Sequence, residues 1–209
     1  MKLLFENWRK YLLSERKSYA RTIEGPGGLV EHDTYITLMK SGIDIRVYYS
    51  DKSGQKQSDK IPSGEVRAIK APENFAPCLH AYQVVESFAD DGFGPLLYDV
   101  VMEAAGEFGL MPDRESLSQD AYDVWHFYMK YRDDVQKKQL DDKSNELTDD
   151  PEDNCGVTSA RAYDDNFDDY RSDDKKQALY DSPVMKVYTK GLTTIEKLEK
   201  LNPSRLIKK

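Results

Sequence analysis

Four short segments of alternating apolar and polar residues follow one another in the first half of this chain, and they constrain its fold more than any other feature. Alternation with a period of two is typical of strands that bury one face. Turn-forming residues such as Gly42 and Gly54 separate the segments, and short connections of this kind join antiparallel neighbours. The sequence therefore predicts an antiparallel meander with strands at Tyr35–Met39, Ile43–Tyr49, Gly64–Lys70 and Leu79–Phe88.

Helical patterns begin directly after the fourth strand. Pro95 suits the first turn of a helix, where its missing N–H group costs nothing, and apolar residues then repeat at helical spacing until Gly109. A short apolar pair, Leu110–Met111, predicts a brief strand. Ser118 is a suitable N-cap for a second helix that contains Trp125 and Tyr128. The order is thus meander, helix, short strand, helix.

The remaining segments complete the predicted division of the chain into consecutive regions. Val184–Tyr188 predicts a late edge strand, and Thr193–Leu201 predicts a helix capped by Thr193 or Thr194. Residues 3 to 17 have the pattern of an amphipathic helix. We therefore expect an N-terminal amphipathic helix in residues 1–24, a core in 25–140, an acidic, partly disordered loop in 141–180, and a strand and helix packed on the core in 181–209.

Charge is concentrated in one region. The net charge is −8, and residues 140 to 175 alone hold thirteen acidic against four basic residues, a net charge of −9. The acidity of the chain as a whole disfavours a broad nucleic-acid surface, because phosphate contacts need clustered cations, although both ends of the chain are basic. No apolar run is long enough to span a bilayer, and charged residues interrupt the N-terminal apolar stretch, so we expect neither a membrane partner nor a signal peptide. The expected location is the cytoplasm.

Metal and disulfide chemistry are not indicated. Cys78 and Cys155 lack metal-ligand spacing, and a disulfide scaffold needs more cysteines. His32, His80 and His126 are too scattered to suggest a metal cluster.

The order of the predicted elements resembles the core of the GNAT superfamily of N-acetyltransferases, in particular the small GNAT-like proteins of tailed bacteriophages. The resemblance covers residues 35 to 140 as fold, and it implies an α/β protein with a central mixed, mainly antiparallel sheet flanked by helices. The C-terminal part resembles only the phage proteins. The segments that carry the likeness are Gly92–Val100, Leu110–Arg114, Ala121–Trp125, Val135–Asp141 and Asp181–Tyr188.

This resemblance implies acetyl-CoA or another acyl-CoA as cofactor. The backbone N–H groups of Gly92, Phe93 and Gly94 would bind its pyrophosphate, because N–H groups at the start of a helix point at a bound anion. The pantetheine arm would pair with exposed backbone of the fourth strand, at Val85 and Ser87, where this strand separates from the next one.

The expected reaction is direct attack of an amine on the thioester, which needs a base for the ammonium group and an acid for the departing thiolate. The resemblance points to Tyr128 as the acid, with Tyr122 as second choice. Glu86 and His80 share one face of the fourth strand and are the candidate bases. The acceptor would be an amine of a small molecule or of a protein.

An alternative is a GNAT-fold protein without catalysis. The family usually has Gln or Arg three positions before the first glycine of the turn, where this chain has Ala89, followed by Asp90 and Asp91. Carboxylates next to a pyrophosphate repel it. Such a protein would be a phage accessory or virion-associated factor with a virion or host-protein partner. Leu13-Ser14-Glu15, within the basic N-terminal stretch, resembles a cleavage site of a prohead protease.

Overall fold

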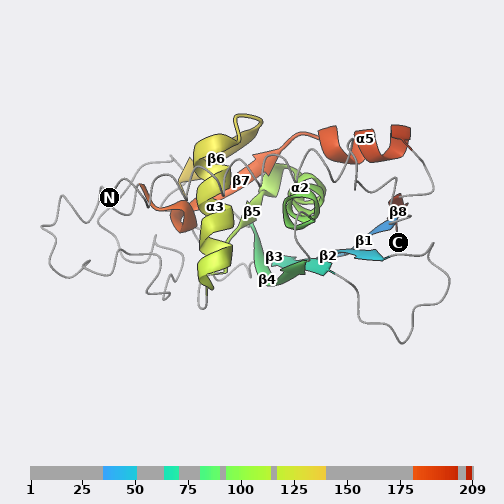
Figure 1. Cartoon of the computed structure of the whole chain (residues 1–209), viewed down its shortest axis with the longest axis horizontal. Coiled ribbons are helices and arrows are strands. Elements are labelled where there is room, and N and C mark those ends of the chain that lie inside the picture. Colours follow the sequence, from blue (N-terminus) through green and yellow to red (C-terminus); the bar gives the residue numbers. More distant parts are fainter. Residues whose placement is uncertain are drawn as a thin grey trace, which may run out of the picture. The chain divides into compact units, whose positions relative to one another are not determined.

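The computed structural model describes residues 35–50, 64–70, 81–89, 93–113, 117–139, 181–201 and 206–208 (Figure 1). These residues form strands β1 to β8 and helices α2, α3 and α5 in a mixed α/β arrangement with a mostly antiparallel sheet. The coarse fold class predicted from the sequence is therefore confirmed. The predicted N-terminal helix and the acidic segment 141–180 lie outside the described residues.

The four strands predicted for the meander are all present. β1 and β2 form a hairpin in which Tyr35 pairs with Ser50 and Ser41 with Asp44. Its turn contains Gly42 at a φ of 56°, a conformation that favours glycine. In β2 the buried residues Ile45, Val47 and Tyr49 alternate with more exposed ones, as the period of two requires, whereas β1 buries three consecutive residues, Ile36 to Leu38. The bounds are Tyr35–Ser41 for β1, Asp44–Ser50 for β2, Gly64–Lys70 for β3 and Tyr82–Ala89 for β4.

The strand order in the sheet is β6-β7-β5-β4-β3-β2-β1-β8. β5 (Leu110–Met111) runs parallel to β4, and β8 (Leu206–Lys208) runs parallel to β1. β7 (Lys186–Lys190) is antiparallel to both β5 and β6 (Val135–Gln139). The prediction that the late strand is an edge strand is therefore wrong, because β6, which the sequence did not reveal as a strand, pairs with its outer side.

Contacts divide the chain into two compact units. Unit 1 comprises the described parts of residues 1–67, 86–104 and 192–209, and unit 2 those of residues 68–85 and 105–191. β3 and β4 contribute residues to both units.

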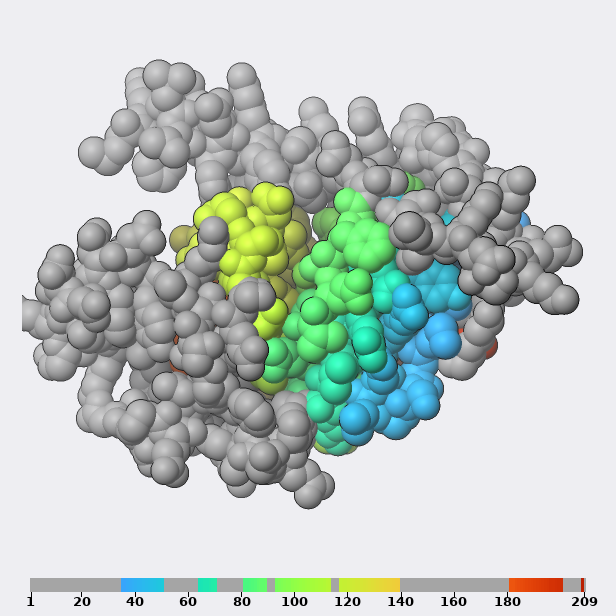
Figure 2. All heavy atoms as spheres, turned by 90° about the horizontal axis from the view of Figure 1, so that it is seen from below, coloured from blue at the N-terminus to red at the C-terminus, as the bar shows by residue number. Residues whose placement is uncertain are grey.

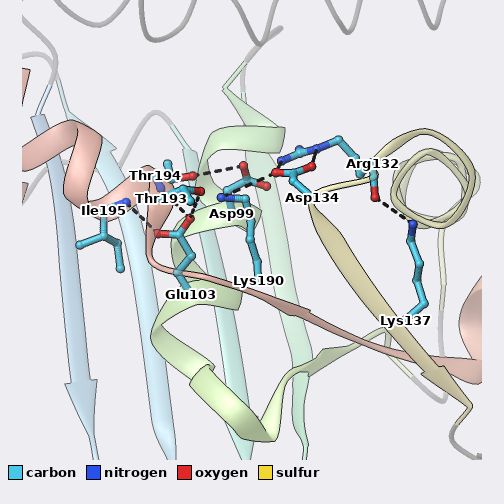
Figure 3. A network of polar contacts seen from close by, with 9 residues as sticks. All are labelled: Asp99, Glu103, Arg132, Asp134, Lys137, Lys190, Thr193, Thr194 and Ile195. Carbon is cyan, nitrogen blue, oxygen red and sulfur yellow. Dashed lines mark hydrogen bonds and ion pairs between the residues drawn. The ribbon is translucent and has the colours of Figure 1, made fainter.

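In unit 1, α2 (Gly94–Ala105) and α5 (Thr193–Leu201) lie on the same side of β1 and β2 (Figure 1). The start of α5 is held by a buried carboxylate of α2: the backbone N–H groups of Thr194 and Ile195 each donate to Glu103 at 2.7 Å (Figure 3). Asp99, one helical turn earlier, is 3.3 Å from the Thr194 hydroxyl. The sequence had predicted a threonine cap, whereas Glu103 satisfies these N–H groups.

In unit 2, α3 (Gln119–Tyr131) follows the predicted N-cap, since the Ser118 hydroxyl accepts the N–H of Ala121 at 3.2 Å. α3 packs against β7 through an aromatic pair, Trp125 and Tyr188, whose ring centroids are 4.9 Å apart. Short 3-10 turns at Gly106–Phe108 and Pro183–Met185 precede β5 and β7.

The loop between α3 and β6 carries an ionic cluster. Arg132 forms a 2.8 Å ion pair with Asp134, and the nearly buried Lys190 lies 3.8 Å from the same carboxylate (Figure 3). Lys137 donates to the Arg132 carbonyl at 2.8 Å. The cluster connects the antiparallel pair β6–β7 to the end of α3.

Candidate functional site

The second half of β4 is exposed and precedes the predicted cofactor turn. β4 pairs with β5 at two positions, Tyr82 with Leu110 and Gln83 with Met111. In the described part of the chain, no strand continues this edge beyond Gln83. The side chains from Val85 to Ala89 are all exposed, with Val85 at 42% and Phe88 at 41%. The strand thus leaves its neighbour before the chain turns toward α2.

The two faces of this exposed segment have different surroundings within unit 1. Ser87 points to α2, where its side chain hydrogen-bonds to the buried Tyr98, and burial raises the pKa of this phenol to about 12. Glu86 points to the opposite face, where its charge raises the pKa values of Arg46 and Arg67 beyond the effect of their own carboxylate partners. The predicted base therefore lies on a charged, solvent-accessible face.

This face is built from ion pairs between neighbouring strands. Arg46 of β2 contacts Glu65 of β3 at 2.5 Å, and Arg67 of β3 contacts Asp44 of β2 at 2.6 Å. Both arginines are partly exposed, whereas the Glu65 side chain is only 2% exposed. Figure 2 shows this region of β1, β2 (blue) and β3 (teal). Each arginine pairs with a carboxylate other than Glu86. Among the described side chains, no ion pair within 4.0 Å involves the Glu86 carboxylate.

The start of α2 is positioned by aromatic packing. Phe93 stacks on Tyr49 of β2, with ring centroids 4.4 Å apart. The Tyr49 ring occupies the space that a Cβ atom at Gly64 would need, and that Cβ would also lie 2.9 Å from the Ala89 Cα atom. Glycine at position 64 therefore lets β2, the end of β4 and Phe93 approach one another.

The first turn of α2 carries backbone N–H groups at the place where the sequence predicts the cofactor turn. The Leu97 N–H bonds to the Phe93 carbonyl at 3.1 Å, which makes Phe93 the residue that opens the helix. The first turn carries no acidic side chain, and a Cβ atom at Gly94 would meet nothing within 4 Å. The earliest N–H groups of a helix have no partner inside it. The predicted residue Gly92 and the loop before it lie outside the described residues.

The predicted acid, Tyr128, is a core residue of unit 2. Its side chain is fully buried, and its ring packs against Trp125, Phe127 and Tyr188 at centroid distances of 5.9–6.4 Å. Tyr122 stacks on His126 instead. The catalytic role of Tyr128 stays a prediction, as does that of His80, which lies outside the described residues. Tyr128 and Glu86 belong to different units.

Sequence reasoning missed one polar pair at the point where β4 and β5 part. Gln83, in the last paired row of β4, directs its amide Nε2 to Asp113 Oδ1 at 3.5 Å, and both residues are half-buried. Asp113 follows the end of β5 by two residues. The sequence could have pointed to Asp113 through its position two residues beyond the predicted short strand. Its contact with Gln83 could not be predicted, because it depends on the parallel register of β4 and β5.

A second concave region lies in unit 1, away from the predicted turn. It is a groove of about 420 Å³ lined by Leu38, Lys40, Ala104, Ile195, Glu199 and Lys208, among others. Its charged groups interact with each other or with backbone: Lys208 contacts Glu199 at 2.5 Å, and Lys40 donates to the Ala104 carbonyl at 2.7 Å. We therefore consider the β4 segment the better candidate for function.

Comparison with known proteins adds no relative: no protein-family model, curated protein or solved structure matches this chain. No helix within the described residues has the length and apolar character required to cross a membrane. The described side chains also include no group of three or more His, Cys, Asp or Glu residues placed to hold a metal ion.

Proposed function

We propose that this chain is a GNAT-like N-acyltransferase that binds acetyl-CoA or another acyl-CoA and transfers the acyl group to an amine. The observation that carries the proposal is the segment of β4 beyond Gln83, which no longer pairs with β5 and precedes α2 in the chain. A meander, an exposed strand end, a helix, a parallel short strand and a second helix follow in the order that the sequence resemblance led us to expect.

In this proposal the pyrophosphate lies at the first turn of α2, on backbone N–H groups of Gly92, Phe93 and Gly94. Support comes from the open space at Gly94 and from the lack of acidic side chains in that turn. The pantetheine arm runs along β4 past Ser87 and Val85, and its amides bond to strand backbone that β5 does not use.

The reaction requires little covalent chemistry from the protein. The amine nitrogen attacks the thioester carbon, the carbon–sulfur bond breaks, and the amine's proton passes to a base while the thiolate gains one from an acid or water. Glu86 is our candidate base because its carboxylate is exposed on β4. Tyr128 remains the candidate acid, and its burial means that it would act only if the α3–β7 packing opens.

The test is calorimetric titration of the purified chain with acetyl-CoA. We expect micromolar binding that is lost in Gly94→Glu, since the new carboxylate would occupy the proposed pyrophosphate position. Gly191→Glu is the matched control, because a Cβ atom at Gly191 also meets nothing within 4 Å but lies in the β7–α5 connection. Binding that survives Gly94→Glu would place the cofactor elsewhere, and no binding at millimolar acetyl-CoA would overturn the proposal.

One observation favours the second candidate, a non-catalytic GNAT-fold accessory or virion-associated protein of a phage that no longer binds CoA. The residue most suited to protonate the thiolate, Tyr128, is built into an aromatic core. If the chain is phage-encoded, its location is the host cytoplasm or the virion. Mass spectrometry of phage particles would then find a chain that begins at Arg16, after the Leu13-Ser14-Glu15 site, and particles without it would remove this candidate.

A further inference from the structure

The groove of unit 1 that lies beside α5 has the size of a small-molecule site. Its volume is about 420 Å³, which is within the range of such sites. On β1, Leu38 and Lys40 are two positions apart and therefore point to the same face. On the other side of the groove, the lining residues have helical spacing and form one side of α5 and its first turn: Leu192, Ile195, Glu196 and Glu199. All lining residues belong to unit 1.

The floor of this groove is aliphatic. Leu38 and Ile195 are buried, whereas Leu192 is 54% exposed. The backbone N–H of Glu196 donates to the Leu192 carbonyl at 3.3 Å, so Leu192 is held in the first turn of α5 although it precedes the helix. An exposed aliphatic side chain that is held next to buried ones favours an apolar ligand, because covering it removes apolar surface from water.

The rim of the groove carries opposite charges on its two sides. The strands contribute Lys40 and Lys208, and α5 contributes Glu196 and Glu199. Lys208 and Glu199 are 2.5 Å apart and join the two sides at one place. The other two charged groups, those of Lys40 and Glu196, also line the groove and are the ones that a ligand can engage.

The contacts of these two groups leave them able to bind a ligand. Lys40 donates to the Ala104 carbonyl at 2.7 Å, and the Glu196 carboxylate lies 4.0 Å from Lys200 of its own helix. A lysine ammonium has three donors and a carboxylate has about four acceptor positions, so both groups can bind a ligand and keep these contacts. Glu196 is also 59% exposed, and an exposed ion pair within one helix contributes little that a ligand would have to replace. The groove thus offers a cation and an anion on opposite sides of an aliphatic floor.

We propose that this groove binds a free α-amino acid with an aliphatic side chain, such as leucine. The side chain covers Leu192, the carboxylate bonds to Lys40, and the ammonium group bonds to Glu196. A ligand with both charges satisfies both sides of the rim, whereas an aliphatic acid or an aliphatic amine satisfies only one. The site goes beyond the proposed acyl transfer and does not depend on it.

The experiment is an NMR titration of the full chain with L-leucine, with 4-methylpentanoate, which lacks the ammonium group, and with 3-methylbutylamine, which lacks the carboxylate. We expect leucine to shift the methyl signals of Leu38, Leu192 and Ile195 with a dissociation constant of about 1 mM or lower. Each analogue should bind at least about fivefold more weakly, because it loses a hydrogen bond to one charged group of the rim.

Two substitutions test the two kinds of contact separately. Glu196→Gln should weaken leucine binding at least about fivefold but leave binding of 4-methylpentanoate within about twofold, because that analogue has no ammonium group. Leu192→Ser should weaken binding of all three ligands. Both side chains are more than half exposed, so the fold should tolerate these changes, and the NMR spectra of the variants check this. Glu107→Gln is the matched control, because Glu107 is also exposed but lies in the 3-10 turn of unit 2.

Leucine binding that Glu196→Gln leaves unchanged would overturn the proposal, as would equal affinity for leucine and the two analogues. Absence of saturable shifts at about 20 mM leucine would also overturn it. So would shifts confined to residues outside the groove. None of these outcomes bears on acetyl-CoA binding, which the calorimetric titration tests by itself.

Discussion

At the scale of single residues, Gly109 is a position where both the backbone conformation and the surrounding space exclude a side chain. Its φ is 71°, and a Cβ atom there would lie 2.7 Å from Val187 Cγ2 and 2.9 Å from the Tyr188 carbonyl oxygen. Gly109→Ala should therefore combine left-handed strain with overpacking against β7. We expect a loss of about 2–4 kcal/mol in the free energy of unfolding, measured by urea denaturation.

Substitutions at two other glycines separate the destabilisation due to backbone strain from that due to overpacking. Gly42 has a φ of 56° but open space around a Cβ atom, and Gly191 has open space without a positive φ. Gly42→Ala should cost about 1 kcal/mol, and Gly191→Ala should be close to neutral. If Gly109→Ala is no more destabilising than Gly42→Ala, the close contact with β7 does not contribute.

At the scale of elements, the attachment of α5 depends on one carboxylate. Glu103 is 2% exposed and accepts the N–H groups of Thr194 and Ile195 at 2.7 Å. In Glu103→Gln the amide group can accept only one of these donors well and brings an N–H₂ group toward the positive end of α5. We expect about 2 kcal/mol less stability, and faster hydrogen exchange at the amides of Thr194 and Ile195.

The control for this prediction is Glu199→Gln. Glu199 is 44% exposed in its contact with Lys208, and exposed ion pairs contribute little to stability. Equal effects of the two substitutions would show that burial of the Glu103 carboxylate is not what matters.

The elements also show what sequence patterns can and cannot predict. β3, β5 and α5 were predicted with their observed bounds, because alternation, helical spacing and caps are local signals. β6 has the sequence Val-Gln-Lys-Lys-Gln, with no alternation of apolar residues, and it is a strand only because it pairs with β7 along its length. β8 likewise exists through its parallel pairing with β1. Such pairings are non-local, so no window of sequence contains them.

Some features of the candidate site also follow from local sequence patterns, and others depend on non-local contacts. The opposite faces of Glu86 and Ser87 follow from alternation along β4 and could be predicted. The meeting of Gln83 and Asp113 depends on strand register across thirty positions of sequence. The burial of Tyr128 could not be predicted from its own helix, because it depends on Tyr188 of β7.

At the scale of the whole molecule, two groups make stability depend on pH with the same sign. Burial, aided by Lys130, lowers the pKa of His126 from 6.5 to about 4. The hydrogen bond from Arg132 lowers the pKa of Asp134 below its usual 3.8. In both cases the unfolded chain binds protons at a higher pH than the folded chain does, so acid favours unfolding.

The two groups act in different pH windows. The contribution of His126 is complete above about pH 6.5 and is lost as the pH falls to about 4, whereas that of Asp134 is present above 3.8 and is lost below it. Urea denaturation between pH 3 and 8 should therefore show stability that falls on acidification. His126→Gln should flatten the curve between pH 6.5 and 4, and Asp134→Asn should flatten it only at the acid end. A His126 titration midpoint near 6.5 by NMR, or stability that rises from pH 6.5 to 4, would contradict the packing of α3 described above.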